Sequence, residues 1–280
     1  MNRALSPTVQ HGKRTFDGHV VAYDLHTPPS LSAPAPLILL THGFASDKST
    51  LAGHAARLCA AGLVVLNINM STLFRPTPEA AQVRNIAAVS AHVRWALTLS
   101  HPSGVQLVDP TRIQLAGHSA GGAVSLEAAM ALRRTGIHVS RVCLLDAVPW
   151  PRTLREAGGL FATGAPGAPP PPAVLCLRSE PSAWNMRGNV LTFLATARAG
   201  RGVSAGASGG ALTDALLVRS GHGDPISPPP KGCLVRALGL LGPPRCAELY
   251  AELLLAFARG EEAAALGALE GAELRVSRFF

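Results

Sequence analysis

Short apolar runs alternate with longer helix-like segments along most of the 280-residue chain, and this alternation constrains the fold more than any other feature. The run 36–41, Pro-Leu-Ile-Leu-Leu-Thr, has no polar face, which is typical of a strand covered on both sides. Such strands occur in parallel sheets whose crossover helices cover both faces. The sequence therefore predicts an α/β fold with a mostly parallel central sheet and helices on both faces. The expected strands are 19–23, 36–41, 63–68, 112–116, 142–145, 174–177 and 215–218, and the expected helices are 50–61, 78–99, 123–134 and 247–259.

Length and composition fit a single globular domain over residues 1–280. Hydrophobic residues make up 48% of the chain and charged residues 15%, so a large core can be buried. The core of this domain is expected over about 13–260. The Gly/Pro-rich stretch 149–172 is interpreted as a stiff connector, with a lid as the alternative. Residues 261–280, rich in Ala, Leu and Glu, are expected to form an appended C-terminal helix.

The chain is basic, with 25 Lys and Arg against 17 Asp and Glu and a formal net charge of +8. Proteins that bind nucleic acids gather basic and stacking side chains on one surface. Here the basic residues are scattered singly or in pairs such as Arg133 and Arg134, and aromatic residues make up only 5% of the chain. We therefore expect no nucleic-acid partner.

The lack of a recognisable targeting signal and the pattern of cysteines favour a cytoplasmic protein. Residues 1–16 lack the apolar segment of a signal peptide, and no apolar run is long enough to span a bilayer. The five cysteines are too few and too irregularly spaced for a disulfide scaffold, and no Cys-x-x-Cys pair indicates zinc. Cys233 and Cys246 flank a Gly/Pro-rich loop, so one disulfide stays open as an alternative if the protein is exported. The expectation is a cytoplasmic location, with no metal and no integral membrane segment.

A candidate nucleophile stands in the third strand-helix unit. The segment 117–121, Gly-His-Ser-Ala-Gly, matches the G-x-S-x-G pattern and lies between an expected strand and an expected helix. Glycines on both sides leave room for a strained turn that presents the Ser119 hydroxyl above the sheet. The following helix points free backbone N–H groups at the charge that develops during attack. A glycine-rich helix start is the alternative reading, and His118 is interpreted as the variable position of the pattern.

A base and an oxyanion site follow from chain order. His222 lies in the Ser-Gly-His-Gly-Asp loop after the apolar run 215–218, where a triad histidine is expected, and it alone among the ten histidines combines this order with glycine neighbours. His42-Gly43-Phe44 directly follows the strand 36–41, where hydrolases with such an elbow place the second oxyanion donor. The predicted donors are the backbone N–H groups of Phe44 and Ala120, with His42 ordering the loop.

Together, the strand-His-Gly-Phe, Gly-His-Ser-Ala-Gly-Gly and late Gly-His elements resemble the α/β-hydrolase superfamily. The resemblance covers about residues 13 to 260. The segments Leu-Leu-Asp-Ala-Val-Pro and Ser-Gly-His-Gly-Asp-Pro are similar to those of chlorophyllase-like and cutinase or dienelactone-hydrolase-like esterases. This resemblance implies an α/β-hydrolase fold and hydrolysis of carboxylic esters through an acyl-serine. It also implies an apolar pocket for a small-molecule or lipid-like ester. No cofactor is expected, and no Walker loop, G-x-G-x-x-G turn or H-E-x-x-H pair is found.

The triad acid has two candidates. Most hydrolases of this fold carry it after the seventh strand, where this chain offers Glu180, for which a surface ion pair with Arg178 is the alternative. Asp146 instead follows the run 142–145, at the edge of the sheet where functional groups gather, and the chlorophyllase-like resemblance places an acid in such an Asp-x-Val segment. An alternative role for Asp146 is to hydrogen-bond the start of the following loop. The sequence favours Asp146 over Glu180.

Substrate chemistry is less constrained. Trp150 and Trp184 are candidate pocket residues, with a packing role as the alternative for each. The same triad can serve a thioesterase, a peptidase or a perhydrolase, and the fold can also persist in a non-catalytic binding protein.

Overall fold

The computed structural model describes residues 7–71, 77–102, 104–151, 153, 169–200, 211–230, 238, 240–271 and 273–279. Within this part of the chain, nine strands form one sheet in the order β1-β2-β4-β3-β5-β6-β7-β8-β9. In this order, the strands from β4 to β8 run parallel to one another. On one side β2 pairs antiparallel with β4, and β1 pairs antiparallel with β2; on the other side β9 pairs antiparallel with β8. The strands are β1 (Thr8–Phe16), β2 (His19–Thr27), β3 (Ala35–Thr41), β4 (Val64–Ile68), β5 (Val108–His118), β6 (Val139–Leu145), β7 (Ala173–Arg178), β8 (Leu212–Leu217) and β9 (Leu274–Phe279).

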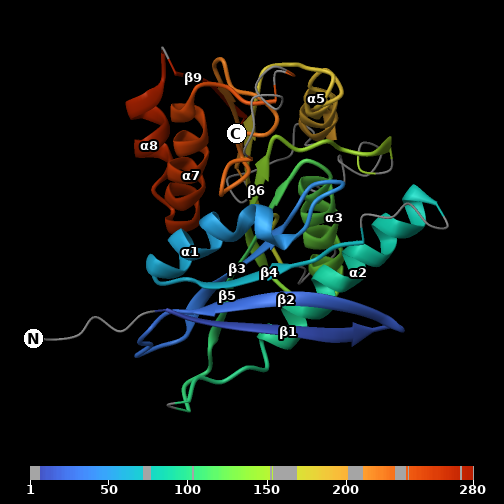
Figure 1. Ribbon diagram of the computed structural model, residues 1–280, viewed down its shortest axis with the longest axis vertical. Helices are drawn as coiled ribbons and strands as arrows, with labels where there is room; N and C mark the ends of the chain where they lie inside the picture. Colours follow the sequence, from blue (N-terminus) through green and yellow to red (C-terminus); the bar gives the residue numbers. More distant parts are fainter. Residues whose placement is uncertain are drawn as a thin grey trace, which may run out of the picture.

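Helices cover both faces of the sheet, as the sequence predicts (Figure 1). One face packs against the short 3-10 helix η1, α1, α7 and α8, and the other against α2, α3 and α5. Their bounds are η1 (Lys48–Leu51), α1 (Ala52–Ala60), α2 (Pro78–Ala96), α3 (Ala120–Arg134), α5 (Val190–Gly200), α7 (Pro244–Arg259) and α8 (Glu262–Leu269).

The apolar side chains of β3 pack into two hydrophobic cores, one on each face of the sheet. Leu37 and Leu39 pack into the core beneath α2 and α3, while Ile38 and Leu40 pack into the core beneath α1 and α7. Because successive side chains of a strand point to opposite faces, a central strand between two helix layers must be apolar at every position. The described chain has the α/β-hydrolase fold.

The N-terminal segment is more ordered than the sequence prediction allowed. Residues 8–16 form β1, which pairs with β2 in a hairpin through Asp17 and Gly18. Both turn residues have positive φ, 46° and 76°, as a two-residue hairpin turn of type I′ requires. The Asp-Gly dipeptide between two strand-like runs was the available signal for this hairpin.

The prediction of a helix over 261–280 is correct for its first part and wrong for its second part. Helix α8 ends at Leu269, and the chain returns as strand β9, which pairs antiparallel with β8. Leu274 is buried against the core, whereas Arg275, Ser277 and Arg278 are exposed. This alternation suits an edge strand better than a helix.

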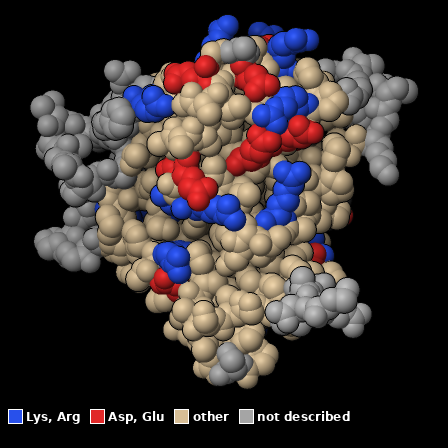
Figure 2. Space-filling model, turned by 90° about the vertical axis from the view of Figure 1, so that its left-hand side faces the viewer, with Lys and Arg blue, Asp and Glu red and all other residues tan. Residues whose placement is uncertain are grey.

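Most of the Gly/Pro-rich stretch 149–172 and Cys233 lie outside the described residues. No helix in the described ranges is long and apolar enough to cross a membrane. On the face formed by α1, α7 and α8, basic and acidic side chains are intermixed (Figure 2). Arg245 pairs with Glu252 and Arg141 with Glu262.

Candidate active site

Ser119 lies at the sharp turn between the end of β5 and the start of α3. Its backbone has φ 54° and ψ −124°, a left-handed conformation that is strained for a residue with a side chain. A Cβ atom at Gly117 would collide with the backbone of Gly121, and one at Gly121 would collide with the backbone of Thr41 and His42. The two glycines of the motif are therefore required by close backbone approach, and the serine hydroxyl is left at the carboxyl edge of the sheet.

Three side chains from three separate strand ends meet at this edge. His222 Nε2 lies 3.0 Å from Ser119 Oγ, and His222 Nδ1 lies 2.6 Å from Asp146 Oδ2. Asp146 is 1% exposed, while Ser119 and His222 are each 9% exposed. Ser119 lies 103 positions and Asp146 lies 76 positions from His222 in the sequence, and the fold brings all three into one hydrogen-bonded line.

Asp146 is held ionised by its partners. Ser179 donates from its backbone N–H to Asp146 Oδ1 at 2.8 Å and from its hydroxyl to Oδ2 at 2.6 Å. Burial alone would raise the pKa of Asp146, but the hydrogen bonds from His222 and Ser179 and the charge of His222 outweigh it and leave this pKa below its ordinary value. The Asn185 amide donates to Ser179 Oγ at 3.0 Å and completes the support.

Glu180, the alternative acid, points elsewhere. It is exposed, and its Oε1 accepts the backbone N–H of Arg219 at 3.1 Å. Arg178 does not pair with it, because the Arg178 guanidinium binds Asp214 at 2.8 Å. The alternative role of Glu180, a surface ion pair with Arg178, is therefore wrong.

His118 has a structural contact that the sequence did not reveal. It is buried, its Nε2 donates to the backbone carbonyl of His222 at 2.8 Å, and the two rings lie 4.8 Å apart. Burial, followed by the nearby charge of His222, lowers the pKa of His118 far below its ordinary value, so the ring is neutral. A local motif cannot reveal such a contact, which spans 104 residues of chain.

The loop that carries His222 is fixed from two further sides. Asp224 accepts the backbone N–H of Gly221 at 2.7 Å and that of Gly242 at 3.0 Å. From α1, the His54 Nε2 donates to the Pro225 carbonyl at 2.7 Å. The base is thus held by backbone contacts rather than by its own side chain alone.

The loop after β3 lies against the nucleophile. A Cβ atom at Gly43 would come within 3.1 Å of Ser119 Cβ, so this glycine allows the close approach. His42 donates from Nδ1 to the Gly43 carbonyl at 2.8 Å and accepts the Met70 N–H at Nε2, 2.9 Å away. His42 therefore orders the loop, tying it to the end of β4.

A small cavity, here called the catalytic slot, lies beside the turn that carries Ser119, because Ala120, the next residue, lines it; its volume is about 30 Å³. Phe44, Ala120 and Trp150 line it, together with Met70 and Val124. Trp184 is not among its described lining residues: this side chain is 47% exposed and donates from Nε1 to the Leu238 carbonyl at 3.2 Å. The structure thus brings Trp150, but not Trp184, to the slot. In the described ranges, no cluster of three or more His, Cys, Asp or Glu side chains could hold a metal ion.

A comparison of the sequence with models of known families identifies the family of the chain. A family model described as PETase, PET hydrolase-like, matches residues 8–152, which is more than half of the chain. The chain belongs to the PET hydrolase-like family. A sequence comparison with curated proteins finds no match.

Solved structures agree on the fold of this PET hydrolase-like chain. The ferulic acid esterase of Streptomyces cinnamoneus is 17% identical with a TM-score of 0.67, and the match covers 100% of this chain and 97% of that one. A dienelactone hydrolase-like promiscuous phosphotriesterase from metagenomic libraries is 16% identical with a TM-score of 0.64, covering 91% and 98%. The dienelactone hydrolase of Anabaena variabilis is 16% identical with a TM-score of 0.58, covering 91% and 98%. Family and fold together support ester hydrolysis.

Proposed function

We propose that the protein is a serine hydrolase that cleaves carboxylic esters, with Ser119 as nucleophile, His222 as base and Asp146 as the triad acid. The observation that carries this proposal is the line from Ser119 Oγ through His222 to Asp146 Oδ2, with distances of 3.0 and 2.6 Å. Nucleophile, base and orienting acid are then each within hydrogen-bond reach of the next.

In the proposed mechanism, His222 Nε2 takes the Ser119 proton as Oγ attacks the ester carbonyl carbon. Asp146 accepts the Nδ1 proton in a hydrogen bond, which holds the reactive tautomer and stabilises the imidazolium that forms. The backbone N–H groups of Phe44 and Ala120 would bind the oxyanion, a contribution of about 10²–10³ in rate per donor.

The tetrahedral species collapses when the bond to the leaving alcohol breaks, and His222 returns the proton to that oxygen. Water then attacks the acyl-serine with His222 again as base, which releases the carboxylic acid and regenerates Ser119. The apolar side chains of Met70, Val124 and Trp150 around the catalytic slot favour an apolar group beside the carbonyl.

A fluorophosphonate reagent tests the proposal, because only an activated serine beside an oxyanion site reacts with it at a useful rate. We expect a single label on Ser119 in intact-protein and peptide mass spectra, together with turnover of 4-nitrophenyl acetate. Ser119→Ala should lose both. Labelling of another residue, or near-normal turnover by Ser119→Ala, would refute the assignment.

A further inference from the structure

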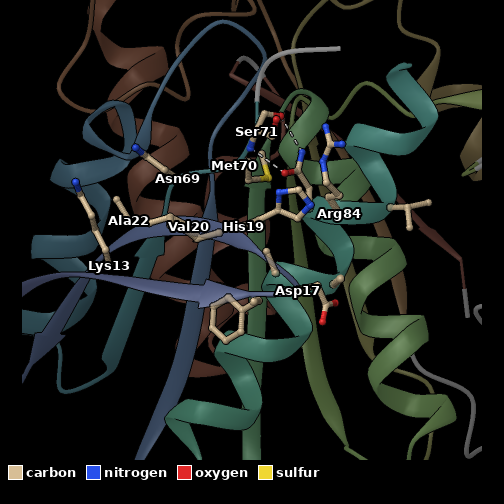
Figure 3. A pocket seen from close by; sticks show the side chains of 15 residues that line it. Lys13, Asp17, His19, Val20, Ala22, Asn69, Met70, Ser71 and Arg84 are labelled. Carbon is tan, nitrogen blue, oxygen red and sulfur yellow. Dashed lines mark hydrogen bonds between the residues drawn. The ribbon is translucent and has the colours of Figure 1, made fainter. Parts of the chain in front are cut away.

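A larger cavity opens beside the catalytic slot, with a volume of about 730 Å³ against about 30 Å³ for the slot. It lies between the β1–β2 hairpin, residues 69–71 after β4, and residues 83–88 of α2 (Figure 3). We call it the hairpin groove. The slot has room for only about two water-sized groups, so any longer substrate must extend beyond it.

The groove and the slot are adjacent, because Met70, Ser71 and Asn85 line both of them. Asn85 fixes the shared wall: its Oδ1 accepts the Ser71 N–H at 2.8 Å, and its Nδ2 donates to the Ser71 carbonyl at 3.0 Å. Met70 is held by its backbone through the contact with His42. Its flexible thioether side chain can therefore shift while the backbone wall stays in place.

The lining of the hairpin groove is amphipathic. Val20 and Val83 line it and are 64% and 46% exposed, so they offer apolar contact area to a ligand. Among the described lining residues, two cationic side chains, Lys13 and Arg84, lie toward opposite ends of the cavity, and Asp17 is the one acid (Figure 3). The groove thus combines apolar contact area with an excess of positive charge.

We propose that the hairpin groove binds the distal part of an acyl chain that ends in a carboxylate, as in a monoester of a linear dicarboxylic acid. This inference rests on the proposed function, because the ester carbonyl must lie at Ser119 for the chain to pass Met70 into the groove. Apolar methylenes would contact Val20 and Val83, and the terminal carboxylate would be attracted by the positive potential that Lys13 and Arg84 create from the two ends of the groove.

Matched substrates separate chain length from charge. Mono-4-nitrophenyl suberate carries the terminal carboxylate, and 4-nitrophenyl octanoate has the same length without it. The acetyl group of 4-nitrophenyl acetate is short enough to be held in the slot alone. We expect kcat/KM to be higher for the suberate than for the octanoate. In Lys13→Met and Arg84→Met, the suberate-to-octanoate ratio should fall about twofold to fivefold, the range of a partly exposed ion pair.

Two further variants complete the experiment. Arg275→Met removes an exposed cation from β9, at the opposite edge of the sheet, and should leave that ratio unchanged. Val83→Trp should narrow the groove and lower kcat/KM for both long esters relative to the acetate.

The possible failures are distinguishable. If the acetate is hydrolysed through Ser119 but the suberate has no advantage, or if Arg275→Met lowers the ratio as much as Lys13→Met, the groove proposal alone is overturned. If no ester is hydrolysed and Ser119 takes no fluorophosphonate, the proposed function fails and this inference fails with it.

Discussion

Substitution of Asp146 is the sharpest test of the proposed mechanism. Its carboxylate contacts His222, whereas Glu180 binds the backbone of Arg219. Asp146→Asn should keep the shape of the site but favour the wrong histidine tautomer, and lower kcat by about 10⁴. Glu180→Gln, the matched control, should stay within about tenfold of the original kcat/KM. Steady-state kinetics on 4-nitrophenyl acetate ranks the two, and the reverse ranking would transfer the acid role to Glu180.

Ser179 leads to a second residue-scale prediction. It follows β7, the strand after which most hydrolases of this fold carry their acid, and its hydroxyl lies 2.6 Å from Asp146 Oδ2. The variant Asp146→Ala lacks the acid. A carboxylate introduced by Ser179→Asp would lie at the end of the neighbouring strand and would point toward His222 Nδ1, as the Asp146 carboxylate does. We expect the double variant Asp146→Ala/Ser179→Asp to be at least about tenfold more active than Asp146→Ala alone.

The matched control for this rescue is Asp146→Ala/Glu180→Asp, which also supplies a carboxylate near β7 but from an exposed position. Equal activity of the two double variants would show that the position of Ser179 is not special. A gain in thermal stability without a gain in kcat would assign Ser179 to packing only.

At the scale of elements, the sequence predicted the helices, strands and turns whose formation depends on neighbouring residues. The Gly-His-Ser-Ala-Gly turn, the apolar run of β3 and the proline-started helix α2 each carry their own signal, and all three are present. Strand β9 was missed because an Ala/Leu-rich helix directly precedes it. The contacts of His118 and Ser179 could not be predicted, since they depend on register between segments 104 and 33 residues apart.

Strand β9 is also expected to matter for stability rather than for catalysis. Leu274 is 1% exposed and pairs with Leu217 at the end of β8. Leu274→Ala leaves a cavity in the core beneath α7 and α8 and should lower the free energy of unfolding by about 2 to 3 kcal/mol. Urea denaturation measures this, with the exposed neighbour Arg275→Ala as control. A loss of kcat at full folding, instead of a loss of stability, would mean that β9 acts on the site.

At the scale of the whole molecule, buried neutral histidines should lower the free energy of unfolding as the pH falls below neutrality. Burial lowers the pKa of His54 and of His92 from 6.5 to about 4. Below about pH 6.5 the unfolded chain binds protons at these positions that the folded protein does not bind. The contribution of the two histidines to stability therefore falls as pH drops, and it levels off below about pH 4. Each of the two should cost about 2 kcal/mol between pH 6.5 and about pH 5.

His92 offers the cleanest test of this pH dependence. Its ring lies 4.6 Å from that of Phe16 and 6.0 Å from that of Tyr23, so a phenylalanine suits the surroundings. His92→Phe removes one titrating group, and its unfolding free energy should fall less steeply between pH 6.5 and about pH 5, by the equivalent of one proton, or about 1.4 kcal/mol per pH unit. The free energy of unfolding is measured by urea denaturation at each pH. Comparing slopes rather than absolute stabilities separates the lost titration from any change in packing, and an unchanged slope would mean that His92 is protonated in the folded protein.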